Sequence, residues 1–209
     1  MKITWAGHAT FLIVTEKGTR ILVDPFAPSS VVYDRKVDVV LVSHHHYDHY
    51  NVELLERARS DSTLILTTSI VASQIHGSRV LRMDKDEVVK GVVFRAVPAY
   101  NVGKQFHQKG VGIGFLLTLE GKTVYITGDT DIIPEMQSVR ADVIIVPVGG
   151  TYTMNSKEAA QVVKMVKASV AIPSHWGSIV GTSDDAESFA ELCGTGVVKV
   201  LKQGESVVV

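Results

Sequence analysis

A chain of 209 residues can bury a substantial core, and a net charge of −1 offers no basic surface for nucleic acid. Hydrophobic residues make up 45% and charged residues 21%, which excludes an intrinsically disordered composition. No signal-peptide pattern, membrane-length apolar run or cysteine pair is present. We therefore expect one cytoplasmic domain over residues 1–209, with no nucleic-acid or membrane partner; the sequence leaves the oligomeric state open.

In the first third of the chain, apolar runs and alternating patterns predict strands followed by helical segments. The expected strands cover residues 2–6, 9–15, 20–23, 37–42 and 63–67. Asn51 is a fair N-cap for a helix that ends near Arg59, and Ser69 can cap a short helix that Gly77 closes. This part of the chain changes from a strand meander to an α/β alternation.

The rest of the chain repeats this order. The expected strands cover residues 88–89, 91–98, 112–119, 123–127, 142–147 and 170–173, with two short strands at 197–201 and 206–209. A helical turn near Pro134, a helix from Asn155 or Ser156 to about Ala168, and a helix at about 184–192 complete the pattern. Two similar halves of this kind bury their sheets against each other beneath outer helices. We expect an α/β fold, an αββα four-layer sandwich of two mixed β-sheets.

The stretch Ser43–His49 has the composition of a metal site, because it places four of the 8 histidines and a carboxylate in six positions. Alternate side chains of an extended loop share a face, so His44 and His46 can meet one ion. A turn at Asp48 and His49 would aim these two side chains at a neighbouring ion about 3.5–4 Å away. The alternative is a polar surface loop, which needs neither this spacing nor the apolar run before it.

Other metal-capable residues follow the ends of other apolar runs. Asp24 follows Val23, Asp129 follows the strand at 123–127, and His175 follows the strand at 170–173. Ligands at the carboxyl ends of strands converge on one edge of a sheet, where α/β proteins generally place their sites. A scattered set of surface residues would not share this position.

The motif His44-x-His46-x-Asp48-His49, directly after a hydrophobic strand, resembles the signature of the metallo-β-lactamase superfamily. The resemblance covers nearly the whole chain and is closer to the lactonase-like branch, which includes ascorbate-6-phosphate lactonase and zinc-dependent hydrolases. It implies the αββα fold, metal-dependent hydrolysis, and one or two Zn²⁺ ions per chain, with Mn²⁺ or Fe²⁺ as alternatives.

Carried over position by position, the resemblance gives His44 and His46 to the first ion and Asp48 and His49 to the second. Asp129 would bridge the two ions. These assignments come from the family and not from the spacing alone.

By the same resemblance, His175 would complete the second site, and Asp24 would orient the ligand loop without binding an ion. Asp48 and Asp129 would hold the ions and could accept the nucleophile's proton. His8 follows the first strand and would overlook the site, either as a substrate-binding or acid/base group or as a hydrogen-bonded residue at a strand end.

One position departs from the family pattern. The other first-site histidine is expected after the strand at 93–98, where this chain has Asn101, a weak ligand for such an ion. His107 could replace it from a loop that folds back, or could face the pocket or solvent while water completes the coordination. We expect His107→Ala to weaken the first site strongly and Asn101→Ala to do little. Asn101 could line the substrate pocket, together with Tyr152 and Thr153 in a segment that resembles the branch.

These residues predict hydrolysis by a metal-bound hydroxide, because metal ions lower the pKa of water from about 15.7 to near 7. The expected substrate is a small ester, lactone or phosphodiester. The alternatives are a nuclease-type phosphodiesterase, which would need an added domain and a basic groove, and a metal-dependent sensor or ligand-binding protein without turnover.

Overall fold

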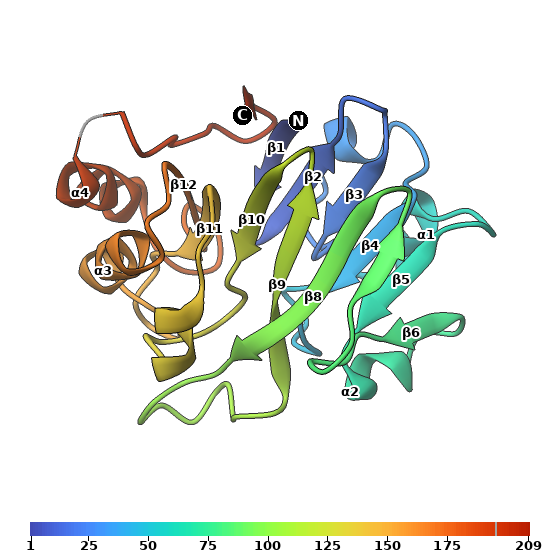
Figure 1. The fold of residues 1–209 in the computed structure, drawn as a ribbon, viewed down its shortest axis with the longest axis horizontal. Coiled ribbons are helices and arrows are strands. Elements are labelled where there is room, and N and C mark those ends of the chain that lie inside the picture. Colours follow the sequence, from blue (N-terminus) through green and yellow to red (C-terminus); the bar gives the residue numbers. More distant parts are fainter. Residues whose placement is uncertain (195) are drawn as a thin grey trace. The chain divides into compact units, whose positions relative to one another are not determined.

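The computed structural model describes residues 1–194 and 196–209, and the chain divides into two compact units. Unit 1 comprises Met1–Arg82 and Leu201–Val209, and unit 2 comprises Met83–Val200. Each unit contains one mixed β-sheet and helices of its own (Figure 1). The predicted α/β class with two mixed sheets is confirmed.

Unit 1 has a seven-stranded sheet in the order β13-β1-β2-β3-β4-β5-β6. The pairs from β13 to β3 are antiparallel, and those from β3 to β6 are parallel. The strands are β1 (Lys2–Gly7), β2 (Thr10–Val14), β3 (Arg20–Val23), β4 (Val39–Val42), β5 (Leu64–Thr67), β6 (Ser78–Val80) and β13 (Ser206–Val208). The helices are η1 (Ser30–Val32), α1 (Val52–Ala58) and α2 (Ser69–Ala72). Because β1, β3 and β4 run in one direction, their carboxyl ends share one edge of this sheet.

Local signals explain where the helices of unit 1 begin. The Asn51 side chain accepts a hydrogen bond from the Leu54 backbone at the start of α1, as an N-cap does. The N-cap of α2 is Thr68, one residue before the predicted Ser69. Strand β6 and the short helix η1 were not predicted. Both are only three residues long, which is too short for a periodic pattern.

Unit 2 has a six-stranded sheet in the order β12-β11-β10-β9-β8-β7. The pairs β10–β11 and β11–β12 are parallel, and the others are antiparallel. The strands are β7 (Glu87–Val89), β8 (Val92–Ala99), β9 (Gly112–Leu119), β10 (Lys122–Ile126), β11 (Val143–Pro147) and β12 (Val170–Ser174). The helices are η2 (Pro134–Ser138), α3 (Ser156–Val166) and α4 (Ser183–Cys193). Here β8, β10, β11 and β12 run in one direction, so their carboxyl ends share an edge.

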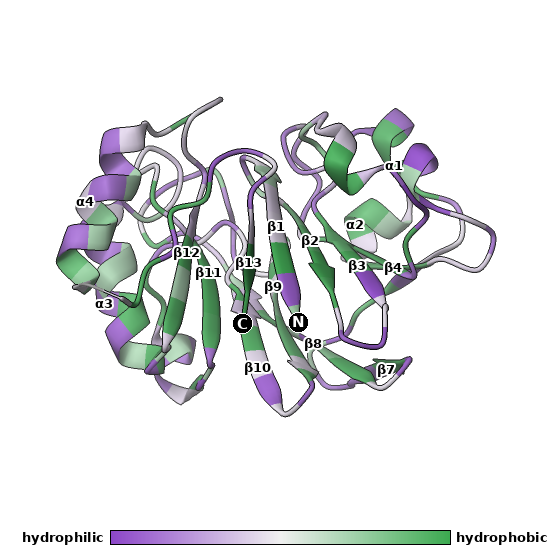
Figure 2. Ribbon diagram, turned by 90° about the horizontal axis from the view of Figure 1, so that it is seen from above, coloured by the Kyte–Doolittle hydropathy of each residue, from purple (hydrophilic) through white to green (hydrophobic). Residues whose placement is uncertain are grey.

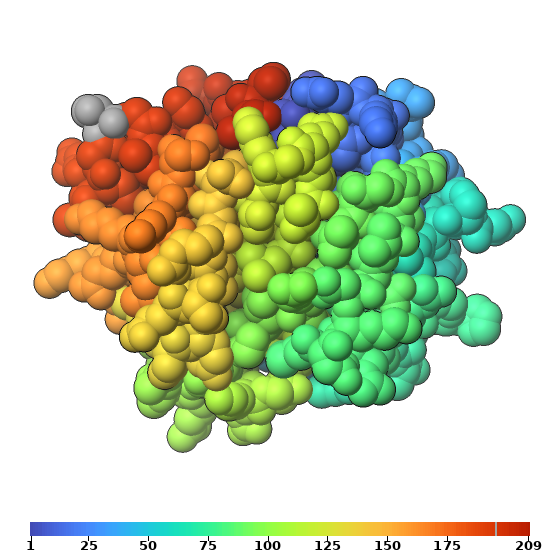
Figure 3. Space-filling view, in the orientation of Figure 1, coloured from blue at the N-terminus to red at the C-terminus, as the bar shows by residue number. Residues whose placement is uncertain are grey.

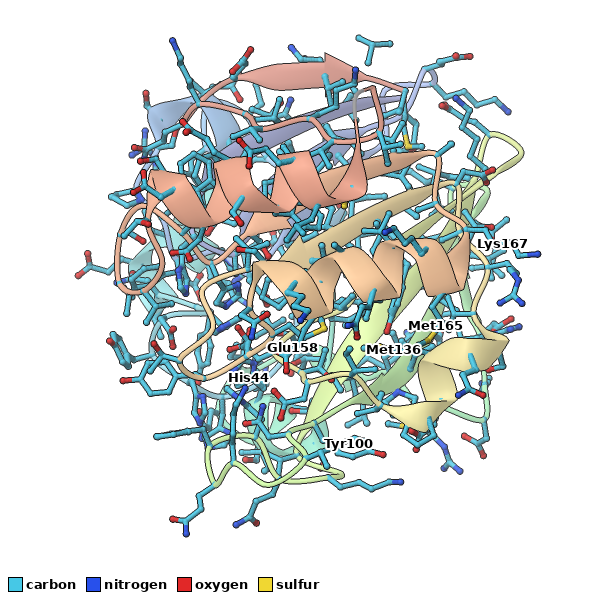
Figure 4. The ribbon with its side chains drawn as sticks, turned by 90° about the vertical axis from the view of Figure 1, so that its left-hand side faces the viewer. His44, Tyr100, Met136, Glu158, Met165 and Lys167 are labelled. Atoms are coloured by element: carbon cyan, nitrogen blue, oxygen red, sulfur yellow. The ribbon has the colours of Figure 1, made fainter. Side chains whose placement is uncertain are left out.

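Helices α3 and α4 lie side by side against the sheet of unit 2 (Figure 1). The strands are mostly hydrophobic, whereas these two helices are hydrophobic on one side only (Figure 2). Asn155 and Glu158 form a capping box at the start of α3, and Lys167 ends the helix in a left-handed conformation; both helix ends are visible in Figure 4. Good caps at both ends and a buried face fix α3 on the sheet.

The end of unit 2 differs from the prediction. The strand expected at 197–201 does not form; Val198 makes an isolated bridge with Ala171 instead. A segment that leaves Val197 and Lys199 bonded only to Ala171 lacks the repeated pairing that defines a strand. Within the described part of the chain, no helix combines the length and hydrophobicity needed to cross a bilayer.

Candidate metal-binding residues

In unit 1, two parallel strands deliver the first candidate residues to the same edge. Strand β3 ends directly before Asp24, and β4 ends directly before Ser43. The Asp24 backbone N–H donates to the carbonyl of Leu41, which extends the pairing of the two strands by one bond at 2.9 Å. As a result, the Asp24 carboxylate accepts from both the Ser43 backbone N–H and the Ser43 hydroxyl, each at 2.8 Å.

Asp24 also controls the orientation of His49. The His49 Nδ1 lies 2.8 Å from Asp24 Oδ2, and both residues are almost completely buried. A carboxylate only accepts hydrogen bonds, so Nδ1 carries a proton, and in the neutral ring the lone pair lies on Nε2. That is the tautomer a metal ligand needs, and the arrangement matches the orienting role that the resemblance assigns to Asp24.

His44 and His46 lie next to each other after β4. The His44 Nε2 is 3.0 Å from the His46 Nδ1, and the Ser43 hydroxyl is 3.0 Å from the His44 Nδ1. Two imidazole nitrogens bound to one tetrahedral Zn²⁺ at about 2.0–2.1 Å would lie about 3.3 Å apart. The two rings therefore have nearly the separation that a shared ion requires. The spacers His45 and Tyr47 are exposed.

His8 holds the Asp48 carboxylate. The His8 Nε2 lies 3.0 Å from Asp48 Oδ2, and His8 is 1% exposed. The Trp5 indole N–H donates to the His8 carbonyl at 3.0 Å and fixes the backbone of this residue. His8 is therefore a buried, hydrogen-bonded residue at the end of β1 that contacts a candidate ligand, and its acid/base role stays a prediction.

In unit 2, Asp129 lies between two imidazoles. The His175 Nε2 is 2.7 Å from Asp129 Oδ1, and the His107 Nε2 is 3.1 Å from Asp129 Oδ2. Each of the three side chains is at most 5% exposed. Asp129 follows β10 and His175 follows β12, so the shared carboxyl edge of the parallel strands brings them together.

The loop that carries His107 folds back on Asn101. The Asn101 backbone N–H donates to the His107 carbonyl at 2.7 Å, and the His107 N–H donates to Asn101 Oδ1 at 3.0 Å. The amide nitrogen of Asn101 donates to the Tyr152 carbonyl at 2.9 Å. These bonds fix which end of the amide is oxygen, and that oxygen is 2.9 Å from the His107 Nδ1.

This orientation decides the chemistry of His107. The Asn101 oxygen is an acceptor, so Nδ1 of His107 is the donor and the lone pair lies on Nε2. Nε2 then faces a carboxylate oxygen at 3.1 Å, and either a second proton on the ring or a metal ion bound by both atoms makes this contact favourable. The donor set of unit 2 therefore fits a bound metal, and Asn101 orients His107 with both of its side-chain polar atoms engaged.

Tyr152 and Thr153 support this loop through their backbone carbonyls. The Tyr152 carbonyl binds Asn101, and the Thr153 carbonyl accepts from the Lys104 ammonium at 2.7 Å. The Tyr152 ring meets the exposed Phe106 ring edge to face, with centroids 4.6 Å apart. Tyr152 and Phe106 therefore present an aromatic surface at the loop of His107.

Three candidate residues have strained backbones. His8, Asp24 and His175 have positive φ angles of 51°, 42° and 57°. Non-glycine residues rarely adopt this region, and a cost of about 1–2 kcal/mol each is expected. The other positive-φ residues that are not glycine lie at turns or at a helix end: Lys90, Glu120 and Lys167.

A family model described as the β-lactamase superfamily domain matches residues 2–175. The chain belongs to the metallo-β-lactamase superfamily. It is 33% identical to a UPF0173 metal-dependent hydrolase of Archaeoglobus fulgidus, covering 99% of this chain and 98% of that protein. It is also 33% identical to one of Pyrococcus abyssi, covering 98% of each.

Solved structures agree with this family. A proposed metal-dependent hydrolase from Parabacteroides distasonis superposes with a TM-score of 0.83 at 25% identity, covering 97% of this chain and 93% of that one. A proposed Zn-dependent hydrolase of the metallo-β-lactamase superfamily from Thermotoga maritima gives a TM-score of 0.61 at 31% identity, covering 88% and 82%. The metallo-β-lactamase fold expected from the sequence is therefore confirmed.

Within this superfamily member, two glycines fix the backbone of His175. A Cβ atom at Gly149 or at Gly181 would lie 2.5 Å from the His175 carbonyl oxygen. Neither position can carry a side chain without moving His175. Sequence reasoning missed this requirement, and it also missed the part of Ser43, whose hydroxyl contacts Asp24 and His49. Ser43 directly precedes the first histidine of the motif, and that position is the one signal that could have identified it.

Proposed function

We propose that this protein is a Zn²⁺-dependent hydrolase of a small ester, lactone or phosphodiester. The observation that carries the proposal is His107: its lone-pair nitrogen faces the Asp129 carboxylate 3.1 Å away, an arrangement that a bound cation stabilises. The donor set is mostly imidazole nitrogen with carboxylate oxygen, which favours Zn²⁺ and suits Mn²⁺ or Fe²⁺ less well.

Each unit supplies candidate metal ligands of its own. In unit 1 these are His44, His46, Asp48 and His49, and in unit 2 they are His107, Asp129 and His175. When bound, Zn²⁺ lowers the pKa of a coordinated water toward 7 and polarises the scissile oxygen. Asp24 and Asn101 hold His49 and His107 in the ligand tautomer, so that each presents Nε2.

Proton transfer would use the carboxylates and His8. Asp48 and Asp129 are the acceptors available for the nucleophile's proton. His8 donates to Asp48, so it can keep that carboxylate ionised and oriented. His8, whose Nε2 lies 3.0 Å from Asp48, is our candidate for returning a proton to a leaving group.

The proposed substrate is a small organic molecule. Phe106 and Tyr152 are 54% and 37% exposed, and their edge-to-face pair offers apolar surface next to the loop of His107. The net charge of −1 does not favour a polynucleotide. A cytoplasmic location fits a chain with a single, free cysteine.

Metal analysis followed by a substrate panel tests the proposal. After loading and desalting, we expect more than one equivalent of Zn²⁺ per chain, and fewer in His107→Ala and Asp48→Ala. His76→Ala is the matched control, because His76 is an exposed histidine outside both residue sets. The panel contains lactones, aryl esters, small phosphodiesters and long DNA. No retained metal, or rapid DNA cleavage without turnover of any small substrate, would refute the proposal.

A further inference from the structure

A cavity of about 500 Å³ lies in unit 2 and is not formed by any candidate metal-binding residue. Its lining comes from β8, β9, β10, η2 and the segment that follows η2. In the space-filling view, these strands (green to yellow-green) and η2 (yellow) face the viewer (Figure 3). Its volume lies in the range of about 300–1,000 Å³ that is typical of small-molecule sites.

The floor of the cavity is a row of side chains across three strands. Leu116 of β9 is paired with Arg95 of β8 on one side and with Tyr125 of β10 on the other. Tyr125 and Met136 are each 1% exposed, whereas Arg95 is exposed. Met136 lies close to Met165 of α3 in the core of unit 2 (Figure 4). The lining therefore combines an apolar floor with charged and polar side chains, among them Arg95, Glu135 and Arg140.

Tyr125 is a buried residue that lines the cavity. Across residues 1–194 and 196–209, no hydrogen bond to its hydroxyl is found. Burial raises the pKa of Tyr125 well above its ordinary value, and the nearby Glu135 raises it further, so the hydroxyl keeps its proton. A ligand oxygen in the cavity can therefore accept a hydrogen bond from this hydroxyl.

Among the charged side chains of the lining, Arg140 is left without an acidic partner. Arg95 forms a bidentate pair with Asp86, and Glu135 accepts from the Lys109 ammonium at 2.9 Å. Arg140 donates only to backbone carbonyls, and no carboxylate of the described residues pairs with it. The lining therefore favours an anion at Arg140.

A second hollow extends this positive end. It has a volume of about 220 Å³, shares Thr123 and Arg140 with the cavity, and adds Asp142 and Lys167. The Asp142 carboxylate accepts from the Thr123 backbone N–H at 2.7 Å. Lys167 is exposed, and its ammonium has no partner among the described residues. Two cations and one carboxylate thus line this hollow, which leaves it a net positive charge.

We propose that this cavity binds a small amphipathic carboxylate with a neutral oxygen in its apolar part. The apolar part lies on Leu116, Tyr125 and Met136, the neutral oxygen accepts from the Tyr125 hydroxyl, and the carboxylate binds Arg140 and Lys167. The site is separate from the candidate metal ligands, so it adds a regulatory or second binding function to the proposed hydrolase.

Three matched probes test the proposal by isothermal titration calorimetry on the full-length protein, both loaded with Zn²⁺ and after chelation. The probe 8-hydroxyoctanoate carries both polar groups, octanoate lacks the hydroxyl, and 1,8-octanediol lacks the carboxylate. We expect saturable 1:1 binding of 8-hydroxyoctanoate in both forms of the protein, and about tenfold weaker binding of each of the other two. Binding only to the Zn²⁺-loaded form would place the carboxylate on the metal and overturn the proposal.

Variants locate the binding. Tyr125→Phe should weaken 8-hydroxyoctanoate about fivefold and leave octanoate unchanged. Arg140→Gln should weaken 8-hydroxyoctanoate about tenfold and leave 1,8-octanediol unchanged. Thr118→Trp, at an exposed lining position, should block all three probes, whereas the exposed Arg35→Gln in unit 1 is the control.

The contrary outcomes are equally clear. Absence of saturable binding up to several millimolar, or equal affinities in all variants, overturns the proposal. A concentration-dependent dimer that Thr118→Trp abolishes, without probe binding, would instead identify this face as a contact between copies of the chain.

Discussion

The substitution Asp24→Asn separates the shape of the Asp24 side chain from its charge. The carboxylate accepts three hydrogen bonds at 2.8 Å, two from Ser43 and one from His49. Asparagine has nearly the same shape and tolerates a positive φ, so the variant should fold. Its amide nitrogen, however, is a donor. If it faces His49, the ring must accept at Nδ1 and carry its proton on Nε2.

The expected effect is a loss of metal affinity. With the proton on Nε2, His49 can bind a metal only after it gives up that proton or turns its ring. Changes to groups that orient metal-binding histidines typically lower affinity by about 10- to 100-fold, or about 1.4–2.7 kcal/mol. Asp34→Asn is the control, because Asp34 is an exposed carboxylate of the same unit that pairs with Arg20.

Two measurements check the reasoning. Competition with a fluorescent chelator gives the Zn²⁺ affinity, and long-range ¹⁵N–¹H spectra of the metal-free protein identify the protonated nitrogen of His49. We expect Nδ1–H in the parent protein and Nε2–H in Asp24→Asn. Unchanged affinity in a variant that has switched tautomer would refute the ligand role of His49. Lost affinity with Nδ1 still protonated would show that Asp24 acts by its charge alone.

In calorimetric titration, His107→Ala should lower Zn²⁺ affinity more than Asn101→Ala, which should lower it about tenfold. The small effect of Asn101→Ala expected from the sequence is revised, because Asn101 holds both the backbone and the ring of His107. Equal affinity in Asn101→Ala and the parent would exclude an orienting role. Lys167→Gly should raise the free energy of unfolding by about 0.5–1 kcal/mol, because φ is 61° at this helix end, and chemical denaturation would measure it; a decrease would contradict the strain argument. Hydrogen bonds from Arg95 lower the pKa of Asp86, so this pair stabilises the fold above the unfolded pKa of about 4 and loses that contribution as pH falls through the lowered value. Because the pair is largely exposed, we expect it to contribute at most about 0.5 kcal/mol. The free energy of unfolding of Asp86→Asn should be lower than that of the parent by this amount at pH 7, and the difference should disappear at pH 2–3. A difference that grows on acidification would contradict the expected sign.

Much of the fold follows from short-range patterns. Runs such as 37–42 and 142–147 are long and apolar enough to identify buried strands, and polar residues directly after them identify strand ends. Parallel pairing then places those strand ends along one edge of the sheet. That is why His44 after β4 and His175 after β12 could be proposed as site residues from the sequence.

What could not be predicted depends on contacts between distant residues. Nothing in the local pattern shows that Asn101 would bind the Tyr152 carbonyl, yet that bond fixes the tautomer of His107. Likewise, the positive φ of His8 and Asp24 is imposed by tertiary bonds, such as the one from the Thr10 hydroxyl to the Asp24 carbonyl at 2.6 Å. The segment at 197–201 meets β12, the edge strand of its sheet, but makes only the single bridge between Val198 and Ala171 and not the repeated pairing of a strand.

The positive φ angles of His8, Asp24 and His175 have an evolutionary consequence. At each of these positions glycine or asparagine would relax the backbone, so a lineage released from selection for metal binding would gain stability by losing these very side chains. Drift would therefore erase them sooner than residues of the ordinary strands and helices. Glycine or asparagine at these three positions in a homologue should mark a protein that has kept the fold and given up the metal.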